Sequence, residues 1–294
     1  MFKAFDTHSF TLDDVVVHAR VGGRGPALLL LHGHPQTHVM WHRVADELAE
    51  HFTVVALDLR GYGDSSRPPS DDSHASYSKR TMARDVAQVM RQLGHDRFFV
   101  CAHDRGARVA HRLALDHRDR VRRMMLLDIA PTLAMYEHTT EKFARAYWHW
   151  FFLIQPPPLP ERLIEADPSS YVRTVMGRRH AGLEAFDPEA LAHYERCASL
   201  PGTAHAICED YRASATIDLD HDRADRAAGN KVDIALRVLW GAHGTVGQCF
   251  DVLALWRDAA TRITGRALEC GHYIAEEQPA ELLDEMLAFF KEQS

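Results

Sequence analysis

The sequence predicts an α/β protein with a mostly parallel central sheet flanked by helices and with an inserted helical cap. Short apolar runs alternate with amphipathic helical patterns along most of the chain, as in parallel sheets. This alternation stops between residues 131 and 230 and then resumes. The 294 residues are 46% hydrophobic and 26% charged, so the chain can bury a large core.

Six apolar runs bounded by polar turns predict strands that are buried on both faces of the sheet. They are residues 27–31, 53–57, 97–102, 121–127, 234–240 and 263–268. Sites in such sheets lie beyond the carboxyl ends of the strands. The polar residues that follow these runs are therefore the first candidates for function.

Helices are predicted where apolar residues recur at helical spacing. Such patterns cover residues 82–93, 109–114 and 282–289. The stretch 131–230 has no strong strand run and is rich in aromatic and helix-forming residues. We therefore expect a core made of residues 1–130 and 231–294, interrupted by a helical cap of residues 131–230.

Charge and composition exclude several classes of function. The net charge of −7 comes without a long run of Lys or Arg, which argues against a nucleic-acid or membrane-surface partner. No apolar stretch reaches the roughly 18–20 residues that span a bilayer, and residues 1–18 lack the apolar centre of a secretory signal. The five cysteines are widely spaced, so we expect free thiols and a cytoplasmic protein. The 20 histidines show no metal-ligand spacing, and we expect no metal and no cofactor.

A candidate nucleophile follows the third predicted strand. The segment Ala102-His103-Asp104-Arg105-Gly106-Ala107 opens a helix, and small residues surround one reactive side chain. This is the nucleophile-elbow pattern, with Asp in the usual place of Ser. The alternative is an Asp that only caps the helix.

Two further motifs follow the first two predicted strands. His32-Gly33-His34-Pro35 is a turn whose His34 backbone N–H would face Asp104 and, with the N–H of Arg105, form an oxyanion hole. Arg60-Gly-Tyr-Gly-Asp-Ser follows the second strand as a loop. Chance occurrence of both motifs at this separation is improbable.

With these motifs the chain resembles the dehalogenase and epoxide-hydrolase branch of the α/β-hydrolase superfamily. Within that branch it is similar to the fluoroacetate (haloacetate) dehalogenases. The resemblance covers nearly the full length, and the insertion corresponds to the helical cap of that family. A homodimer would be typical of the family.

A base and an acid would complete the catalytic group. His272, after Gly271 and before the last helix, resembles the catalytic His of this fold; a neutral His can deprotonate the water that hydrolyses an ester on Asp104. That His needs a carboxylate to orient it. The loop at residues 241–247 has no acid, so we expect Asp128, at the end of the strand 121–127, to take this role. The alternative for Asp128 is a turn cap.

Substrate contacts are predicted on both sides of the nucleophile. Arg105 and Arg108 lie three residues apart in the first turn of a helix and would hold a substrate carboxylate in bidentate fashion. The alternative is a pair of surface arginines matched by acids. The resemblance implies that His149, Trp150 and Tyr211 form a halide pocket, since each can donate a hydrogen bond. Without it, an aromatic stripe is more often core.

The sequence therefore predicts a hydrolytic dehalogenase of small 2-haloacids. Asp104 would displace the halide of fluoroacetate or chloroacetate, and water activated by His272 and Asp128 would release glycolate. One alternative is an epoxide hydrolase with the same triad and cap tyrosines; another is a non-catalytic ligand-binding homologue. Two departures from the family pattern bear on substrate size and halide preference: His34 replaces an expected aromatic such as Phe, and Arg178 and Arg179 make the pocket mouth strongly basic.

Overall fold

A computed structural model describes residues 1–291 and contains the predicted α/β fold, built on an eight-stranded sheet. The strand order across the sheet is β1-β2-β4-β3-β5-β6-β7-β8. The strands are β1 (Phe5–Thr11), β2 (Val16–Gly22), β3 (Ala27–Leu31), β4 (Thr53–Leu57), β5 (Phe98–His103), β6 (Val121–Leu127), β7 (Val232–Gly241) and β8 (Ala260–Leu268).

The six strands from β3 to β8 pair in parallel and correspond to the six apolar runs. β3 is buried along its whole length, which is why its sequence is continuously apolar. The first two strands were not predicted. β1 and β2 pair antiparallel with each other, and β2 pairs antiparallel with β4. Because most residues between the buried Phe5 and Phe10 of β1 are exposed, β1 lacks a continuous apolar run.

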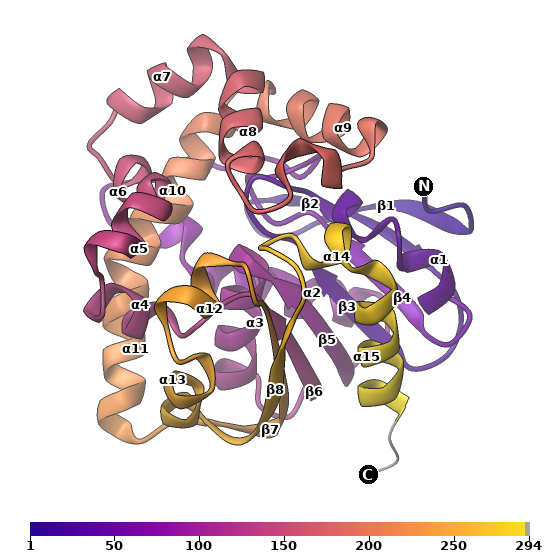
Figure 1. The fold of residues 1–294 in the computed structure, drawn as a ribbon. Helices are drawn as coiled ribbons and strands as arrows, with labels where there is room; N and C mark the ends of the chain where they lie inside the picture. The colour runs from indigo at the N-terminus through magenta and orange to yellow at the C-terminus, as the bar shows by residue number, and fades with distance from the viewer. Residues whose placement is uncertain (292–294) are drawn as a thin grey trace.

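Helices cover both faces of the sheet (Figure 1). The three predicted helical patterns lie in α2, α3 and α15. The helical segments of the core are η1 (His38–Trp41), α1 (Ala45–Leu48), η2 (Ala75–Tyr77), α2 (Lys79–Gln92), α3 (Asp104–Asp116), α12 (Thr245–Cys249), α13 (Val252–Ala259), α14 (Ile274–Glu277) and α15 (Pro279–Lys291). None of the helices in residues 1–291 is long and apolar enough to cross a membrane.

Between β6 and β7 the chain is helical. The segments are α4 (Thr132–Glu137), α5 (Glu141–Ala146), α6 (Trp148–Leu153), α7 (Leu159–Ala166), α8 (Pro168–Gly177), η3 (Gly182–Ala185), α9 (Pro188–Ala198), α10 (Thr203–Ala215) and α11 (Ile217–Ala228). They lie over the top and the left side of the sheet in Figure 1. We call residues 131–230 the cap. Asp167 and Asp187 accept hydrogen bonds from the first turns of α8 and α9, which fixes where these two cap helices begin.

The topology brings four loops together. Those that follow β3, β5, β6 and β8 carry His34, Asp104, Asp128 and His272. Parallel strands end at one edge of the sheet, so loops far apart in the sequence meet there. The cap supplies the remaining walls of the site.

Candidate active site

Asp104 is the first residue of α3 and has a φ of 44°, in the left-handed region that L-residues rarely adopt. The tight turn explains the small residues of the motif. A Cβ on Gly106 would lie 2.4 Å from the carbonyl oxygen of His32, and a Cβ on Gly33 would lie 2.5 Å from the Cβ of Asp104. Strain of this kind is typical of functional sites.

One of the two predicted oxyanion-hole donors contacts the candidate nucleophile, Asp104. The His34 backbone N–H donates to Asp104 Oδ1 over 3.0 Å. This contact occupies Oδ1 and leaves Oδ2 as the oxygen that is available for attack. The second predicted donor, the Arg105 N–H, stays a prediction.

Asp104 is buried and still ionised. Burial alone would raise the pKa of its carboxyl group, but His272, His103, Arg108 and Arg105 outweigh this effect and lower the pKa well below its usual range. A carboxylate that stays charged in a largely dry site is a competent nucleophile.

His272 and Asp128 form a hydrogen-bonded pair. His272 Nδ1 lies 2.6 Å from Asp128 Oδ2, so Nε2 is the nitrogen that remains to take a proton. Asp128 Oδ1 accepts the Gly241 N–H at 3.0 Å. The loop after β7 thus contributes a backbone donor that holds the acid supplied by β6.

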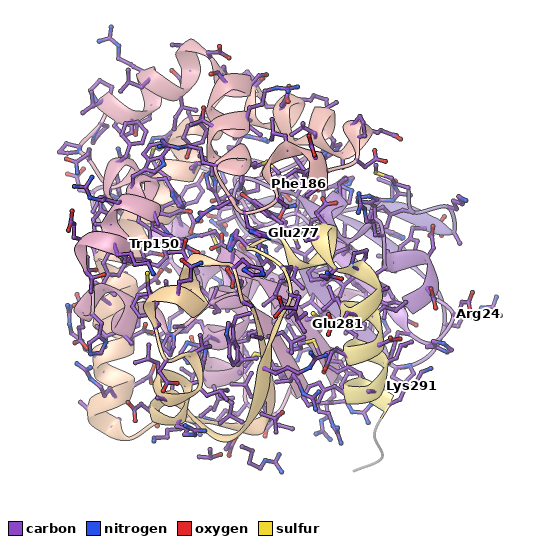
Figure 2. The ribbon with its side chains drawn as sticks, in the orientation of Figure 1. Arg24, Trp150, Phe186, Glu277, Glu281 and Lys291 are labelled. Atoms are coloured by element: carbon purple, nitrogen blue, oxygen red, sulfur yellow. The ribbon has the colours of Figure 1, made fainter. Side chains whose placement is uncertain are left out.

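The loop that carries His272 has a support that the sequence analysis missed. The carboxylate of Glu277, labelled in Figure 2, accepts the backbone N–H groups of Gly271 and Tyr273 at 2.6 and 3.0 Å. His103 Nε2–H donates to the His272 carbonyl at 2.9 Å. An acid at the start of the final helical region, a few residues after Gly271, was the available signal.

Arg105 has a partner that the sequence analysis did not predict. Its Nε and Nη2 both bind the carboxylate of Asp210, at 2.8 Å each, and Nη2 also reaches Ser214. The bidentate face expected to hold a substrate carboxylate is therefore already occupied. Only Nη1 remains, buried and without a hydrogen-bond partner among residues 1–291.

Asp210 is a second missed residue. Besides Arg105 it binds the Lys79 ammonium group and accepts the Tyr62 hydroxyl at 2.7 Å. Asp218 lies 4.0 Å from the same ammonium group. The two acids offset the two cations in this buried network. An Asp directly before Tyr211 was the sequence signal, but nothing in the sequence paired it with Arg105.

Arg108 is bound to neutral groups instead. Its Nη1 donates to Thr132 Oγ1 at 2.8 Å and to the Ala130 carbonyl at 3.3 Å, and its guanidinium carbon lies 4.7 Å from the centre of the Trp150 ring. The Nε atom is buried without a partner in the described chain. Arg108 therefore has no acid as a direct hydrogen-bond partner, and its charge acts on Asp104.

The three cap residues expected at the halide are buried together. The rings of His149 and Tyr211 lie 5.9 Å apart, and those of Trp150 and Tyr211 lie 6.4 Å apart. The Trp150 N–H and the Tyr211 hydroxyl are buried and meet no acceptor within residues 1–291. A buried donor left without a partner costs about 1–3 kcal/mol, so packing alone is a poor explanation for two of them side by side. Such atoms are typical of a ligand site.

The imidazole of His34 also lines this space. Its Nε2 lies 3.0 Å from the Tyr171 hydroxyl, and its ring is 6.1 Å from that of His149 at an angle of 17°. Burial lowers the pKa of His34 to about 3, so this ring is neutral near pH 7. His34 replaces an apolar wall with a polar group.

Two clusters of metal-ligating side chains lie elsewhere in the described residues: His18, His38 and Asp58, and Asp64, His193 and Cys197. In the first, both Asp58 oxygens accept backbone N–H groups, from His38 and Asp64, and Asp58 Oδ1 also binds the His38 ring. In the second, Arg196 binds both oxygens of Asp64. Internal hydrogen bonds therefore account for both clusters.

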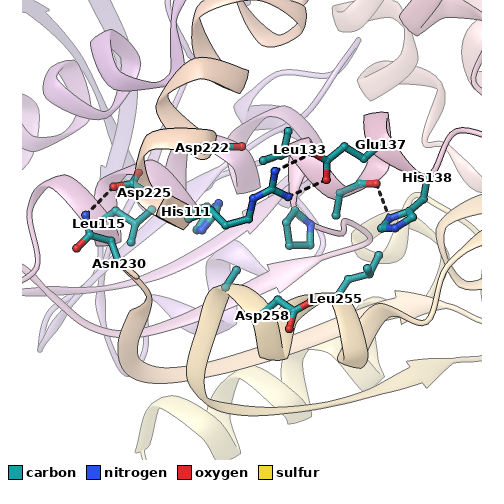
Figure 3. A pocket seen from close by; sticks show the side chains of 14 residues that line it. His111, Leu115, Leu133, Glu137, His138, Asp222, Asp225, Asn230, Leu255 and Asp258 are labelled. Atoms are coloured by element: carbon teal, nitrogen blue, oxygen red, sulfur yellow. Dashed lines mark hydrogen bonds and ion pairs between the residues drawn. The ribbon is translucent and has the colours of Figure 1, made fainter. Parts of the chain in front are cut away.

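A separate pocket of about 130 Å³ lies where α4 and α11 of the cap meet α3 and α13 (Figure 3). Several of its polar side chains pair with one another: Arg226 binds Glu137 at 2.8 and 2.9 Å, and Asn230 binds Asp225 at 2.9 Å. None of the candidate catalytic residues lines it. It belongs to the junction of cap and core.

Comparison with known proteins gives consistent matches. Residues 26–279 match the model of the alpha/beta hydrolase fold family. The chain is 43% identical to a fluoroacetate dehalogenase from Burkholderia sp. over 98% of this chain and 95% of that protein. It is 34% identical to a soluble epoxide hydrolase from Corynebacterium sp., over 96% of each chain. A crystal structure from Nostoc sp. PCC 7120, assigned to the alpha/beta hydrolases, matches with a TM-score of 0.96 and 52% identity over the whole of both chains.

Proposed function

We propose, since this chain belongs to the alpha/beta hydrolase family, that it is a hydrolase which removes halide from small 2-haloacids such as fluoroacetate or chloroacetate. One observation carries the proposal. Four buried donor atoms without partners in the described chain, on Arg105, Arg108, Trp150 and Tyr211, belong to residues that pack together near the ionised Asp104. A ligand with a carboxylate and a halogen would use all four.

The first step forms an ester. Asp104 Oδ2 attacks the carbon that bears the halogen, and the halide leaves with the bonding electrons. The Trp150 N–H and the Tyr211 hydroxyl would stabilise the charge that develops on the halogen. Arg108 and the Nη1 of Arg105 would hold the substrate carboxylate, whose charge would otherwise repel Asp104.

The second step hydrolyses the ester. His272 Nε2 takes a proton from water while Asp128 holds the ring, and the hydroxide attacks the Asp104 carboxyl carbon. The negative charge then falls on Oδ1, which already accepts the His34 N–H. The ester bond breaks, and the 2-hydroxy acid takes the proton from His272. The carboxyl group of Asp104 then loses the second proton of the water to solvent, which restores the carboxylate.

The wild-type protein should release halide from haloacetates. An ion-selective electrode measures the halide released from fluoroacetate, chloroacetate and bromoacetate. Chromatography follows the opening of an epoxide in a parallel reaction. Halide release without epoxide opening supports the proposal. Epoxide opening without halide release from any haloacetate would assign the same triad to epoxide hydrolysis, the activity in the name of the Corynebacterium relative.

Replacement of Trp150 by Phe should slow carbon–fluorine cleavage more than carbon–bromine cleavage. The ring over Arg108 is kept and only the N–H donor is lost. A hydrogen bond to a charged group contributes about 1.5–3 kcal/mol, so kcat for fluoroacetate should fall on the order of 10- to 150-fold. Trp148→Phe, on the same helix, is the matched control, because Trp148 packs on Phe152. Equal losses for all three halides would remove Trp150 from the halide pocket.

A further inference from the structure

Arg179 lies in the loop between α8 and η3, which rests on the loop of His272. The ring of His180 stacks on that of His243 at 4.4 Å and 18°, and a Cβ on Gly271 would lie 2.7 Å from the Cβ of His180. Arg178 and His180 are exposed, whereas Arg179 is half-buried. The middle residue of this basic segment therefore turns inward from the cap.

The guanidinium group of Arg179 lies beside the site. Its central carbon is 4.5 Å from the centre of the Tyr147 ring, which in turn lies 5.3 Å from the ring of His149 and 6.4 Å from that of His272. Burial is the largest cause that lowers the pKa of His149, and the charge of Arg179 is the second largest. Within residues 1–291 Arg179 makes no ion pair.

The charged groups around the site suggest a role for the Arg179 cation. Asp210 and Asp218 offset Arg105 and Lys79, so that network adds little net charge to the site. Asp104 and Asp128 are the remaining acids described above, and Arg108 is one remaining cation without an acid partner. A haloacid would bring a further negative charge. Arg179 is the second cation without an ion-pair partner among residues 1–291, and it lies on the cap side of the site.

We propose that Arg179 is a specificity-determining residue that attracts and helps to hold substrates with a carboxylate at the cap side of the site. The assignment rests on the proposed function and extends it, since it adds a third arginine to the two on α3. It also gives a role to one of the two arginines in the basic segment 176–180. Arg178, next in the chain but exposed, has no such role.

The test measures binding without turnover. In an Asp104→Asn background, calorimetry with chloroacetate gives the dissociation constant for Arg179→Gln and for the matched variant Arg178→Gln. Asn tolerates the left-handed backbone of residue 104. Electrostatic attraction of this kind raises local anion concentration at least about tenfold. We therefore expect Arg179→Gln to weaken binding on the order of tenfold and to flatten its salt dependence, with no change for Arg178→Gln.

Two further measurements separate the outcomes. Arg179→Lys should restore most of the binding if charge is what matters, and thermal melting of each variant reports on folding. If Arg179→Gln binds chloroacetate like Arg178→Gln while the wild type releases halide, the Arg179 assignment is wrong and the proposed function stands. If the Asp104→Asn protein does not bind chloroacetate and the wild type releases no halide, both are overturned.

Discussion

Replacement of His272 by Ala should trap the protein as an ester on Asp104. Ester formation needs the Asp104 carboxylate, whose pKa His103, Arg108 and Arg105 still lower in this variant, and the halide donors, which the variant retains. Ester hydrolysis needs a base, and His272 Nε2 is the nitrogen left to serve as one once Asp128 holds Nδ1. Loss of a general base slows its step on the order of 10²- to 10⁴-fold. After incubation with chloroacetate, mass spectrometry should show a carboxymethyl group on the peptide that contains Asp104.

The double variant Asp104→Asn/His272→Ala is the control and should remain unmodified. Wild-type protein should show little adduct at steady state, because its second step is intact. An unmodified Asp104 peptide in a folded His272→Ala variant would mean that Asp104 is not the nucleophile. Halide release that continues at the wild-type rate would remove His272 from the mechanism.

Much of the fold follows from local patterns. The runs that became β3 to β6 are apolar because helices cover the sheet on both faces, and this signal is independent of the rest of the chain. The edge strand β8 is largely exposed, and its apolar run is weaker. The hairpin of β1 and β2 was not predicted from the sequence, because its strands have exposed positions and therefore contain no continuous apolar run. Partly exposed antiparallel strands, such as the two in residues 1–22, are therefore harder to predict from sequence than the buried parallel strands.

The candidate site was predictable to the extent that it lies at strand ends. Asp104, Asp128 and His272 each follow a buried strand or precede a recognisable helix, and the structure brings Asp128 and His272 into contact. The partners of Arg105 were not predictable. Asp210 lies 105 residues further along the chain, and only the packing of α10 against the core sets its oxygens on the guanidinium group.

The inward position of Arg179 could not be predicted from the sequence either. The sequence marks residues 178 and 179 as basic but cannot say which of them turns inward, because the direction is set by the contact of His180 with the loop of His272. Contacts between cap and core are long-range, and no periodicity reports them. This is why membership of the hydrolase family was easier to predict than the details of substrate selection.

Replacement of Arg108 by Leu should abolish most of the preference for a carboxylate substrate. Arg108 is the clearer of the two α3 arginines to test. Removal of Arg105 would leave Asp210 with one fewer cation in a buried network, whereas the direct partners of Arg108 are neutral. A charge-assisted hydrogen bond contributes about 1.5–3 kcal/mol. Its loss should lower kcat/KM for chloroacetate on the order of 10- to 150-fold.

The neutral analogue chloroacetamide is the internal control for this variant. It lacks the charge that Arg108 would hold, so its kcat/KM should change little between wild type and Arg108→Leu. The ratio of kcat/KM for the acid to kcat/KM for the amide should therefore fall steeply in the variant. Arg108→Lys should recover only part of the ratio, because an ammonium group cannot reach Thr132 and a substrate with the same planar fork. If the wild type hydrolyses the amide as well as the acid, Arg108 does not select a carboxylate. The haloacid assignment then fails as well, because that assignment requires a site that favours a negatively charged substrate over its neutral analogue.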